Sequence, residues 1–493
     1  MEENNKDTVY VGLEKVPLKS EREENKKKKK STFLTIVICA LFLVLGIVLG
    51  IIYCGAIHPM LSSNASNVIS EIEAILDRNW IYAVDHENLQ EEMENKAYYG
   101  MTAFEEDPYT TYMSPEELDS FSTGINMDYV GIGVQYVMND DMALIERVFM
   151  NSPAQNAGLQ VGDIIDSIDG VSVSGLTSDE IKERVIGEEG TVVVIGIIRD
   201  NKKMDIPVTR GSVDNSVYCY AENDYVVLEL ISFGNNTCNE CIKYLDQYSD
   251  YDKLIIDLRG DTGGYQTAVQ EICGLFVGDG VVYLRQKDSK GVETADLTKC
   301  PKTYDNFKKI ILLVDGETAS AAEVFTICLK EYLDYVTIVG ETTYGKGVIQ
   351  TTNYLLGGGV LKYSSFYWYS PNGTSIHKEG IKPDVEVMLD DIAYEYYYDM
   401  EDDEKYEFDS VSSVVDFCEK SLSFLGYEVD RTDGYFDKSF ENALRKYQKD
   451  NNLPDNGVID NNTYKSIISD VKYELTIKEK DKQLQKAIEL ISQ

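Results

Sequence analysis

Between residues 212 and 389, short runs of consecutive apolar residues alternate with helical patterns. Four runs have the length of buried strands and end at turn residues: 225–231, 254–258, 310–314 and 336–339. Helical patterns begin near Cys238, Thr267 and Ser320. Strands that alternate with helices in this way predict an α/β core for this region.

Two regions outside this core have a different pattern. Residues 125–211 hold short strands, turns and one helix expected from Ser178 to Val185, which indicates a β-rich domain inserted before the core. Residues 411–471 hold helical patterns, which predict a small all-α domain.

Three further segments flank these domains. Residues 58–124 carry helical spacing from Ser63 to Tyr99, which predicts a helical region. Residues 390–410 are rich in acids and tyrosines and predict an exposed linker. Residues 472–493 predict an amphipathic helical tail with a fraying end.

The N-terminal residues combine a basic tail with a long apolar stretch. Residues 1–30 end in five lysines, and no charged residue occurs from Phe33 to Ile57. We expect residues 31–57 to cross a membrane as a helix, because the stretch is long enough to span the hydrocarbon core. The lysines should stay in the cytoplasm, which places the rest of the chain outside. The alternative is a cleaved signal peptide, but no small-x-small cleavage site follows.

Composition excludes several classes of partner. With 85 Asp and Glu against 46 Lys and Arg, the chain has a net charge of −39. Such a surface repels phosphates, so we exclude nucleic acids as partners. Cys238 and Cys241 form a C-x-x-C pair without a second pair or a histidine at zinc-ligand spacing. We therefore predict no metal site, and nothing in the pattern implies an organic cofactor.

Ser320 and Lys346 form the candidate chemistry of the core. Ser320 stands among alanines where the helix after the strand 310–314 should begin, and there its hydroxyl lies beside unpaired backbone N–H groups. Lys346 stands between two glycines after the next strand. Burial would lower the pKa of its amine and let it take a proton from Ser320. This arrangement predicts a Ser–Lys hydrolase.

Two other chemistries fit these residues less well. A Ser–His–Asp triad would have to use His86 or His377, because His58 abuts the apolar segment. The loop 340–346 matches the phosphate-binding pattern G-x-x-x-x-G-K. However, Gly347 offers no hydroxyl for magnesium, and a strand pattern rather than a helix follows it.

Six motifs between about residues 82 and 387 resemble, in order and spacing, those of the carboxyl-terminal processing peptidases, also called tail-specific proteases. They are DPYTTY at 107–112, YVGIGV at 129–134, DLRGDTGG at 257–264, TASAAE at 318–323, GETTYGKGVIQ at 340–350 and GIKPD at 380–384. The resemblance implies a crotonase-like α/β serine protease core. It further implies that Ser320 is the nucleophile, Lys346 the general base and Gln350 the residue that positions this lysine.

The glycine motif ends a buried strand in a turn whose backbone amides face the proposed reaction. We expect the amides near Gly263 and Gly264, together with that of Ala321, to stabilise the oxyanion. In this motif Asp261 and Thr262 replace the Asn-Pro that is more usual in the family.

Residues 125–211 resemble a PDZ domain. A terminal carboxylate of a peptide would be held by successive backbone N–H groups, and the peptide would add as a strand. The residues expected to bind it are Tyr129, Val130, Gly131, Ile132, Gly133 and Val134.

Residues 411–471 resemble the three-helix peptidoglycan-binding domain of cell-wall enzymes, which implies peptidoglycan as a partner. Together, the resemblances imply a membrane-anchored serine endopeptidase outside the cell that acts on proteins with exposed C-termini. They also suggest that residues 58–124 pack against the core or against a second subunit in a homodimer. One alternative is an inactive envelope scaffold of PDZ and wall-binding modules. Another is acyl-CoA chemistry on the same core, which an external location disfavours.

Overall fold

The computed structural model describes residues 64–493 except 82, 84, 85, 87, 127, 128, 140, 141, 151, 200, 201, 214, 215, 357, 397, 399, 401–403, 476 and 479. The expected basic tail 1–30 and membrane helix 31–57 lie outside the described residues. Within the described part, no helix is long and apolar enough to cross a membrane. The chain divides into two compact units, residues 1–101 and 102–493.

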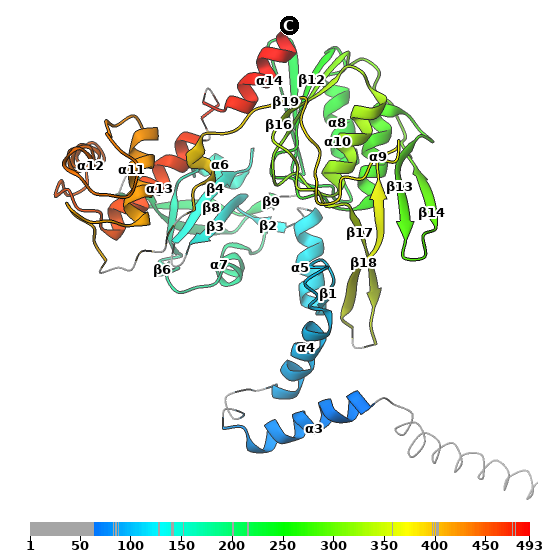
Figure 1. Ribbon diagram of the computed structural model, residues 1–493, viewed down its shortest axis with the longest axis horizontal. Helices are drawn as coiled ribbons and strands as arrows, with labels where there is room; N and C mark the ends of the chain where they lie inside the picture. The colour runs from blue at the N-terminus through cyan, green and yellow to red at the C-terminus, as the bar shows by residue number, and fades with distance from the viewer. Residues whose placement is uncertain are drawn as a thin grey trace, which may run out of the picture. The chain divides into compact units, whose positions relative to one another are not determined.

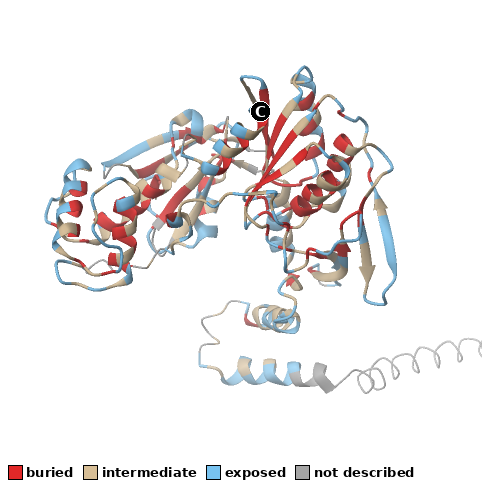
Figure 2. Ribbon diagram, turned by 45° about the horizontal axis from the view of Figure 1, so that its top comes forward, coloured by how far each residue is buried: buried red, intermediate tan, exposed pale blue. Residues whose placement is uncertain are grey.

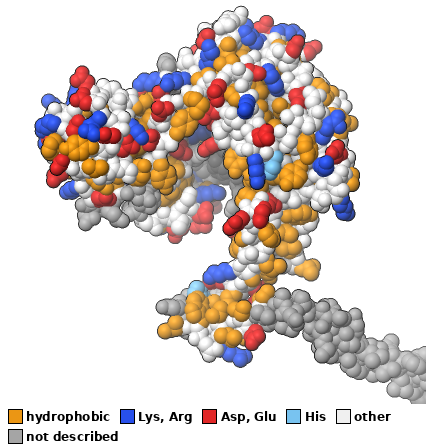
Figure 3. Space-filling model, viewed as in Figure 1, with side chains coloured by type: hydrophobic (Ala, Val, Ile, Leu, Met, Phe, Trp, Pro, Cys, Tyr) orange, Lys and Arg blue, Asp and Glu red, His pale blue; other side chains and the backbone are white. Residues whose placement is uncertain are grey.

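The described part of the first unit consists of helices (Figure 1). Helix α3 spans Asn64–Asn79 and α4 spans Leu89–Thr102. The helical spacing expected from Ser63 to Tyr99 is divided between these two helices, and α3 ends where the Asn79 side-chain amide donates to the carbonyl of Ile75. The apolar side of α3 carries Ile72 and Ile75, each 51% exposed, and Figure 3 shows hydrophobic side chains gathered along this helix.

The core of the second unit is a six-stranded sheet in the order β10-β11-β12-β15-β16-β19. Its strands are β10 Val217–Glu222, β11 Tyr225–Leu230, β12 Lys253–Asp257, β15 Lys309–Val314, β16 Val336–Gly340 and β19 Val385–Glu386. All neighbours pair in parallel except β10 with β11. The helices that connect them are α8 Thr237–Gln247, α9 Gln266–Val277 and α10 Ala321–Tyr332. The predicted α/β core is thus present.

Both faces of this sheet are covered by helices. Successive side chains of each strand point to opposite sides, so each strand contributes residues to both faces. Leu254, Ile256 and Leu312 pack with α8, α9 and α10. Ile255 and Ile311 pack on the other face with the C-terminal helix α14, Lys482–Ser492. The central strands are accordingly buried along their length (Figure 2).

A second sheet lies beside the core and carries a long hairpin. Its order is β1-β18-β13-β14, and β17 pairs with β18. The strands are β1 Thr111–Met113, β13 Val282–Asp288, β14 Glu293–Leu297, β17 Val348–Tyr354 and β18 Val360–Tyr369. Helix α5, Pro115–Asn126, follows β1. This sheet matters for function because β17 follows the loop of Lys346 directly.

The inserted domain is β-rich, as expected. Its main sheet has the order β3-β4-β5-β7-β8, with β6 on β5, and β2 pairs with β9. The elements are β2 Tyr129–Gly131, β3 Val134–Asn139, β4 Met142–Val148, α6 Pro153–Ala157, β5 Ile164–Ile168, β6 Val171–Ser172, α7 Ser178–Val185, β7 Val192–Arg199, β8 Lys202–Thr209 and β9 Gly211–Val213. Strand β3 lies at the edge of its sheet, with β4 as its recorded neighbour among the described strands.

The C-terminal region is helical and returns to the core. A short 3-10 helix, η3 Asp391–Tyr394, precedes α11 Ser413–Phe424, α12 Lys438–Asp450 and α13 Asn461–Leu475. The prediction that residues 390–410 form an exposed linker is wrong in part, because Ile392 and Met400 are buried against these helices. The fraying expected of the tail is also wrong, since Leu484, Ala487 and Ile491 of α14 are buried on the sheet.

Candidate active site

Ser320 precedes the first residue of α10 and has a backbone conformation that is rare outside glycine. Its φ is 56° and its ψ is −116°. The turn around it is held by a hydrogen bond to the glycine motif, in which the N–H of Ala319 donates to the carbonyl of Asp261 at 2.9 Å. A nucleophile at a sharp strand-to-helix turn has its hydroxyl exposed by such geometry. The sequence indicated the turn but not this conformation.

Glu323 fastens the turn of Ser320 to the loop of Lys346. Its side chain is 0% exposed. The carboxylate accepts hydrogen bonds from the N–H groups of Ser320 (2.9 Å), Gly345 (2.7 Å) and Lys346 (2.9 Å), and from the hydroxyl of Thr343 (2.6 Å). Burial raises the pKa of Glu323, and these hydrogen bonds oppose that rise. One buried side chain therefore sets the spacing between the two loops.

A cavity of roughly 180 Å³ lies in front of Ser320. It brings together Gly264, Ser320, Ala321 and Gln350, four of the residues that the sequence analysis singles out. The other lining residues are Phe121, Ile125, Tyr265, Gln266, Val269, Leu284, Val324, Val348, Ile349, Thr352, Lys362 and Trp368. The cavity is mostly apolar, and Lys362 is the one charged side chain among its lining residues.

The amine of Lys346 lies against the ring of Tyr109, with Nζ 4.7 Å from the ring centre. Its pKa is lowered by burial and by repulsion from Lys362, while Glu323 opposes the shift. Within the described part of the chain, no hydrogen bond joins this amine to Ser320 or Gln350. The lysine is thus half-buried near the serine loop but turned toward Tyr109.

Gln350 lines the cavity of Ser320 from β17, but the expected hydrogen bond to Lys346 is not formed. Its side-chain amide donates instead to the carbonyl of Val348 at 3.3 Å. The physical reason is local: β17 begins only at Val348, and its register shifts between Ile349 and Gln350. The strand alternation that would put residues 346 and 350 on one face therefore does not extend over this segment.

The structure distinguishes which backbone N–H groups near the glycine turn are available to an oxyanion, which the sequence alone left open. The N–H of Gly263 already donates to Asp261 Oδ1 at 2.8 Å. The N–H groups of Gly264 and Ala321, which line the cavity, have no hydrogen-bond acceptor among the described residues. Gly263 also lies close to the serine, because a Cβ added to it would come within 2.9 Å of Ser320 Cβ. The expectation that Gly263 donates to the oxyanion is thus not met in this geometry.

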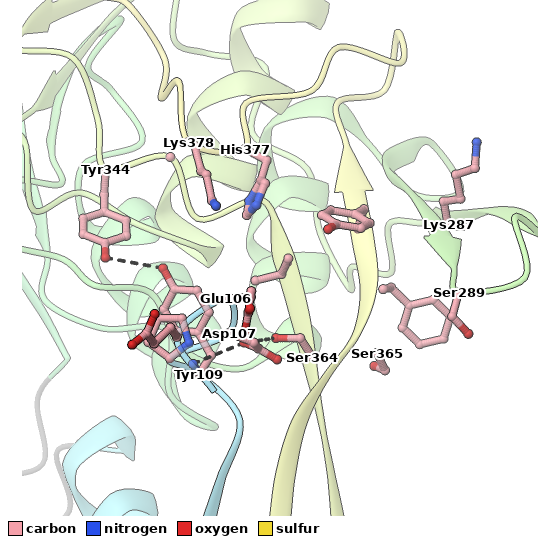
Figure 4. Close-up of a pocket in the computed structure, with 16 residues that line it drawn as sticks. Glu106, Asp107, Tyr109, Lys287, Ser289, Tyr344, Ser364, Ser365, His377 and Lys378 are labelled. Atoms are coloured by element: carbon pink, nitrogen blue, oxygen red, sulfur yellow. Dashed lines mark hydrogen bonds between the residues drawn. The ribbon is translucent and has the colours of Figure 1, made fainter. Parts of the chain in front are cut away.

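A second cavity of roughly 660 Å³ lies beside the first and shares Val348 with it. Figure 4 shows Asp107, Tyr109, His377 and Lys378 among its lining residues. Asp107 accepts a hydrogen bond from Ser364 at 2.9 Å. His377 Nδ1 is buried without a hydrogen-bond partner among the described residues, so the structure gives no support to a Ser–His–Asp triad.

The predicted peptide-binding segment joins β2 to β3. The carbonyl of Ile132 accepts a hydrogen bond from Ala154 at 2.7 Å, and that of Gly133 accepts one from Phe149 at 3.1 Å. The N–H groups of Ile132 and Gly133 have no acceptor among the described residues, although both residues are buried. Tyr129, Val130 and Gly131 pair with β9, and Val134 begins the edge strand β3. The segment thus offers unpaired donors next to an open strand edge.

Three residues of the site have roles that were not predicted from the sequence. Glu323 had a signal, since Ser-x-x-Glu at 320–323 is the pattern of a capping box. Tyr109 lies in the motif DPYTTY at 107–112, but no pattern in the sequence indicates that its ring contacts Lys346. Lys362 had no signal, because a lysine in a strand is usually a solvated one.

Three segments match family models. Residues 224–387 match peptidase family S41, residues 144–199 match the PDZ domain, and residues 412–467 match a peptidoglycan binding domain. A probable CtpA-like serine protease of Staphylococcus aureus (strain COL) is 31% identical over 404 residues, which cover 80% of this chain and 79% of the relative. A protein of the same description from Staphylococcus epidermidis (strain ATCC 12228 / FDA PCI 1200) is 30% identical over 378 residues, 76% of either chain.

Among solved structures, the photosystem II D1 C-terminal processing protease aligns with a TM-score of 0.42 and 22% identity over 66% of this chain and 94% of its own. The α/β core and the inserted PDZ domain define a serine protease of the tail-processing class. The chain belongs to peptidase family S41, among the CtpA-like carboxyl-terminal processing proteases.

Proposed function

We propose that this chain is a membrane-anchored endopeptidase that binds the C-terminus of a protein through its PDZ domain and cuts within the tail by a Ser–Lys mechanism. The observation that carries the proposal is the position of Ser320. It stands at the start of α10, in a rare backbone conformation, and lines an apolar cavity with two unpaired backbone amides. This is a suitable arrangement for attack on a peptide carbonyl.

The proposed first step forms an acyl-enzyme. Ser320 Oγ attacks the scissile carbonyl while Lys346 Nζ takes the hydroxyl proton, and the same proton then passes to the leaving amine as the C–N bond breaks. For this step the amine must leave the Tyr109 ring and turn toward Ser320. Catalytic hydrogen bonds are often unformed before substrate binds, so the present orientation is compatible with the step.

The depressed pKa of Lys346 supports its role as base. Burial and the neighbouring Lys362 both favour the neutral amine. In the second step water, deprotonated by the neutral Lys346, attacks the acyl carbon, and the proton passes from Lys346 to Ser320 Oγ as the ester C–O bond breaks. Gln350 would position the lysine only after its amide leaves the carbonyl of Val348.

For the oxyanion we propose the amides of Gly264 and Ala321. Both line the cavity and have no acceptor among the described residues. Gly263 would act indirectly, since its hydrogen bond to Asp261 holds the glycine turn in place. Loss of one oxyanion donor typically raises the barrier by about 2.7–4 kcal/mol.

The PDZ domain would select the substrate. A terminal carboxylate would accept hydrogen bonds from the N–H groups of Ile132 and Gly133, and the preceding residues would pair with the free edge of β3. A hydrogen bond joins β3 to the first residue of α7, where the Tyr136 hydroxyl donates to the carbonyl of Ser178 at 2.8 Å.

We further propose an extracytoplasmic location. Residues 31–57 would anchor the chain in the membrane, with the basic tail inside. The C-terminal helical domain would then contact peptidoglycan, as its family match suggests. Dimerisation through the exposed apolar face of α3 remains part of this proposal.

The test uses the full chain in detergent with an active-site serine probe and a peptide substrate. Probe labelling and cleavage should both disappear in Ser320→Ala, and cleavage should disappear in Lys346→Ala. Ser423→Ala, an exposed serine on α11, is the matched control and should retain both. Near-normal cleavage in either site variant would refute the Ser–Lys mechanism. An unlabelled wild-type chain that still binds C-terminal peptides would favour the inactive scaffold.

A further inference from the structure

Lys362 lines the cavity of the proposed nucleophile and forms no ion pair within the part of the chain that the structure describes. It comes from β18, where it lies opposite Thr352 of β17 and Thr111 of β1. Directly opposed residues of antiparallel strands have Cβ atoms about 4.5–5.5 Å apart on the same face of the sheet. Thr352 also lines the cavity, so the register of the hairpin directs Lys362 into the same space.

Among the described residues the Lys362 amine forms a contact with an aromatic ring and no hydrogen bond or ion pair. Nζ lies 4.5 Å from the ring centre of Phe121, another residue of the cavity wall. Among the described residues no carboxylate lies within ion-pair distance of it, although the chain carries 85 Asp and Glu. None of the cavity-lining residues is acidic.

A half-buried lysine with no carboxylate partner among the described residues is unusual on energetic grounds. A half-buried charge loses solvation, and proteins ordinarily compensate by pairing it. Burial lowers the pKa of Lys362 accordingly. In a chain of net charge −39, a partner would have been easy to supply from a neighbouring strand. The missing counter-charge is therefore one that the substrate can bring.

We propose that Lys362 is a carboxylate-binding subsite, so that the enzyme prefers peptides that place a carboxylate beside the scissile bond. The inference rests on the proposed function, because it deepens the specificity of the same cavity. The carboxylate has two possible sources: the side chain of an Asp or Glu near the cleaved bond, or the free terminus of a short tail. Both would form a charge-assisted hydrogen bond with the amine in surroundings of low polarity.

The experiment compares matched peptides on the full chain in detergent. One series places Asp or Asn at each position within four residues of the cleaved bond, and a second series has a free or an amidated C-terminus. For wild type we expect one Asp position, or the free terminus, to raise kcat/KM by about tenfold over its neutral counterpart. In Lys362→Met the ratio at that Asp position should fall to one and a terminal ratio should fall to the part due to the PDZ domain, whereas in Lys362→Arg both should persist.

Ratios within one variant are used because Lys362 also influences Lys346. Lys243→Met removes another lysine that rests on an aromatic ring, 5.2 Å from the centre of Tyr244, but lies on the surface of α8, and it should leave the ratio unchanged. A terminal-carboxylate effect that survives in Lys362→Met belongs to the PDZ domain, so only the part of the effect that Lys362→Met removes supports the subsite. The proposal is overturned if wild type cleaves the Asp and Asn members of every pair equally and if Lys362→Met leaves the effect of amidation unchanged.

Binding to the Ser320→Ala chain separates this result from the proposed mechanism. Fluorescence anisotropy with the Asp and Asn peptides, all amidated at the C-terminus, should show tighter binding of the Asp member, and the additional Lys362→Met substitution should abolish the difference. Equal affinities would overturn the subsite even if wild type proves inactive. If wild type cleaves neutral peptides and Ser320→Ala does not, the proposed function stands whatever the ratio.

Discussion

Glu323 is the residue on which the geometry of the site most depends. It is the acceptor for backbone donors on two loops that are distant in sequence, the Ser320 turn and the Lys346 loop. A charged acceptor with several donors can be replaced only by another acceptor, because each unpaired buried donor costs about 1–3 kcal/mol. Its effect on the reaction would therefore be exerted through the positions of the other residues.

Glu323→Gln should lower kcat with a smaller effect on KM. The amide nitrogen of glutamine replaces one of the two oxygens, so it faces either the N–H groups of residues 320 and 346 or that of residue 345, and the two loops should move apart. We also expect the free energy of unfolding to fall by about 1–3 kcal/mol, measured by urea denaturation. Glu489→Gln, on the exposed side of α14, is the control. Lost stability with unchanged kcat would show that Glu323 acts only structurally.

Cleavage should depend on pH through Lys346. The base is active when neutral, so kcat/KM should rise with pH as Lys346 loses its proton, and burial brings this rise below the ordinary lysine pKa of 10.5. Lys362→Met removes a repelling charge and raises the pKa of Lys346, so the rise should move to higher pH. A neutral peptide is the substrate for this profile. An identical profile in Lys362→Met and wild type would contradict the coupling.

The catalytic candidates were predictable because each one is tied to a local pattern. Ser320 follows a buried strand at a helix start, and Lys346 stands between glycines after the next strand. The role of Asp261 was not predictable, since only the folded turn reveals that its carboxylate occupies the N–H of Gly263. The direction of the Lys346 side chain was equally hidden, because Tyr109 reaches it from a segment more than 200 residues away.

At the scale of elements, α14 shows why a sequence-based expectation of fraying failed. The helix has apolar residues on one side, and a pattern of that kind does not say which surface receives it. Here the receiving surface is the back of the core sheet, where Ile255, Ile311 and Leu313 would otherwise face solvent. The helix start is also fixed, because Arg259 pairs with Asp481 at 2.9 Å.

Ile491→Ala should therefore destabilise the core rather than only the terminus. The side chain is 0% exposed, and truncation of a buried isoleucine costs about 2–5 kcal/mol. The measurement is urea unfolding followed by the fluorescence of Trp368, which is buried in the same unit. Lys486→Ala, a surface position on α14, should change the unfolding free energy little. A core midpoint that does not move would mean that α14 is a dispensable cover.

The C-terminal helical domain should lose stability as pH rises. Burial raises the pKa of Glu419 from 4.5 to about 7. Its Oε2 accepts from the N–H groups of Asp433 and Gly434 at 2.9 Å, whereas its Oε1 has no hydrogen-bond partner among the described residues. Between these two pKa values the folded state holds a proton that the unfolded state has lost. Stability therefore decreases from pH 4.5 to 7, by about 2–3 kcal/mol, and then levels off.

Hydrogen exchange of α11, α12 and α13 measures this effect in the full chain. Exchange protection should be higher at pH 5 than at pH 8 after correction for intrinsic rates. Glu419→Gln should flatten the dependence and increase protection at pH 8, because a neutral side chain needs no proton to be buried. Protection in Glu419→Gln that still falls with pH would assign the effect to another group.

Across the whole second unit, the PDZ domain is joined to the core next to its own peptide-binding segment. Phe149 donates its N–H to Gly133 of that segment, and its ring stacks on Tyr218 of β10 at 6.1 Å with an interplanar angle of 8°. Arg147, two residues earlier, forms an ion pair with Glu229 of β11. A peptide that shifts the segment would thus act on residues held directly by the core.

We therefore expect occupancy of the PDZ domain to change kcat as well as KM. For wild type, a peptide with a free C-terminus should be cleaved with a higher kcat than the same peptide amidated. Arg147→Met breaks the ion pair while leaving the N–H groups of Ile132 and Gly133 in place. It should reduce the kcat ratio toward one and leave the affinity of the PDZ domain for the free peptide unchanged. Lys203→Met, which removes a PDZ ion pair with Asp166 far from this contact, is the matched control. A kcat ratio that persists in Arg147→Met would mean that the ion pair between Arg147 and Glu229 does not carry the influence of the PDZ domain to the active site.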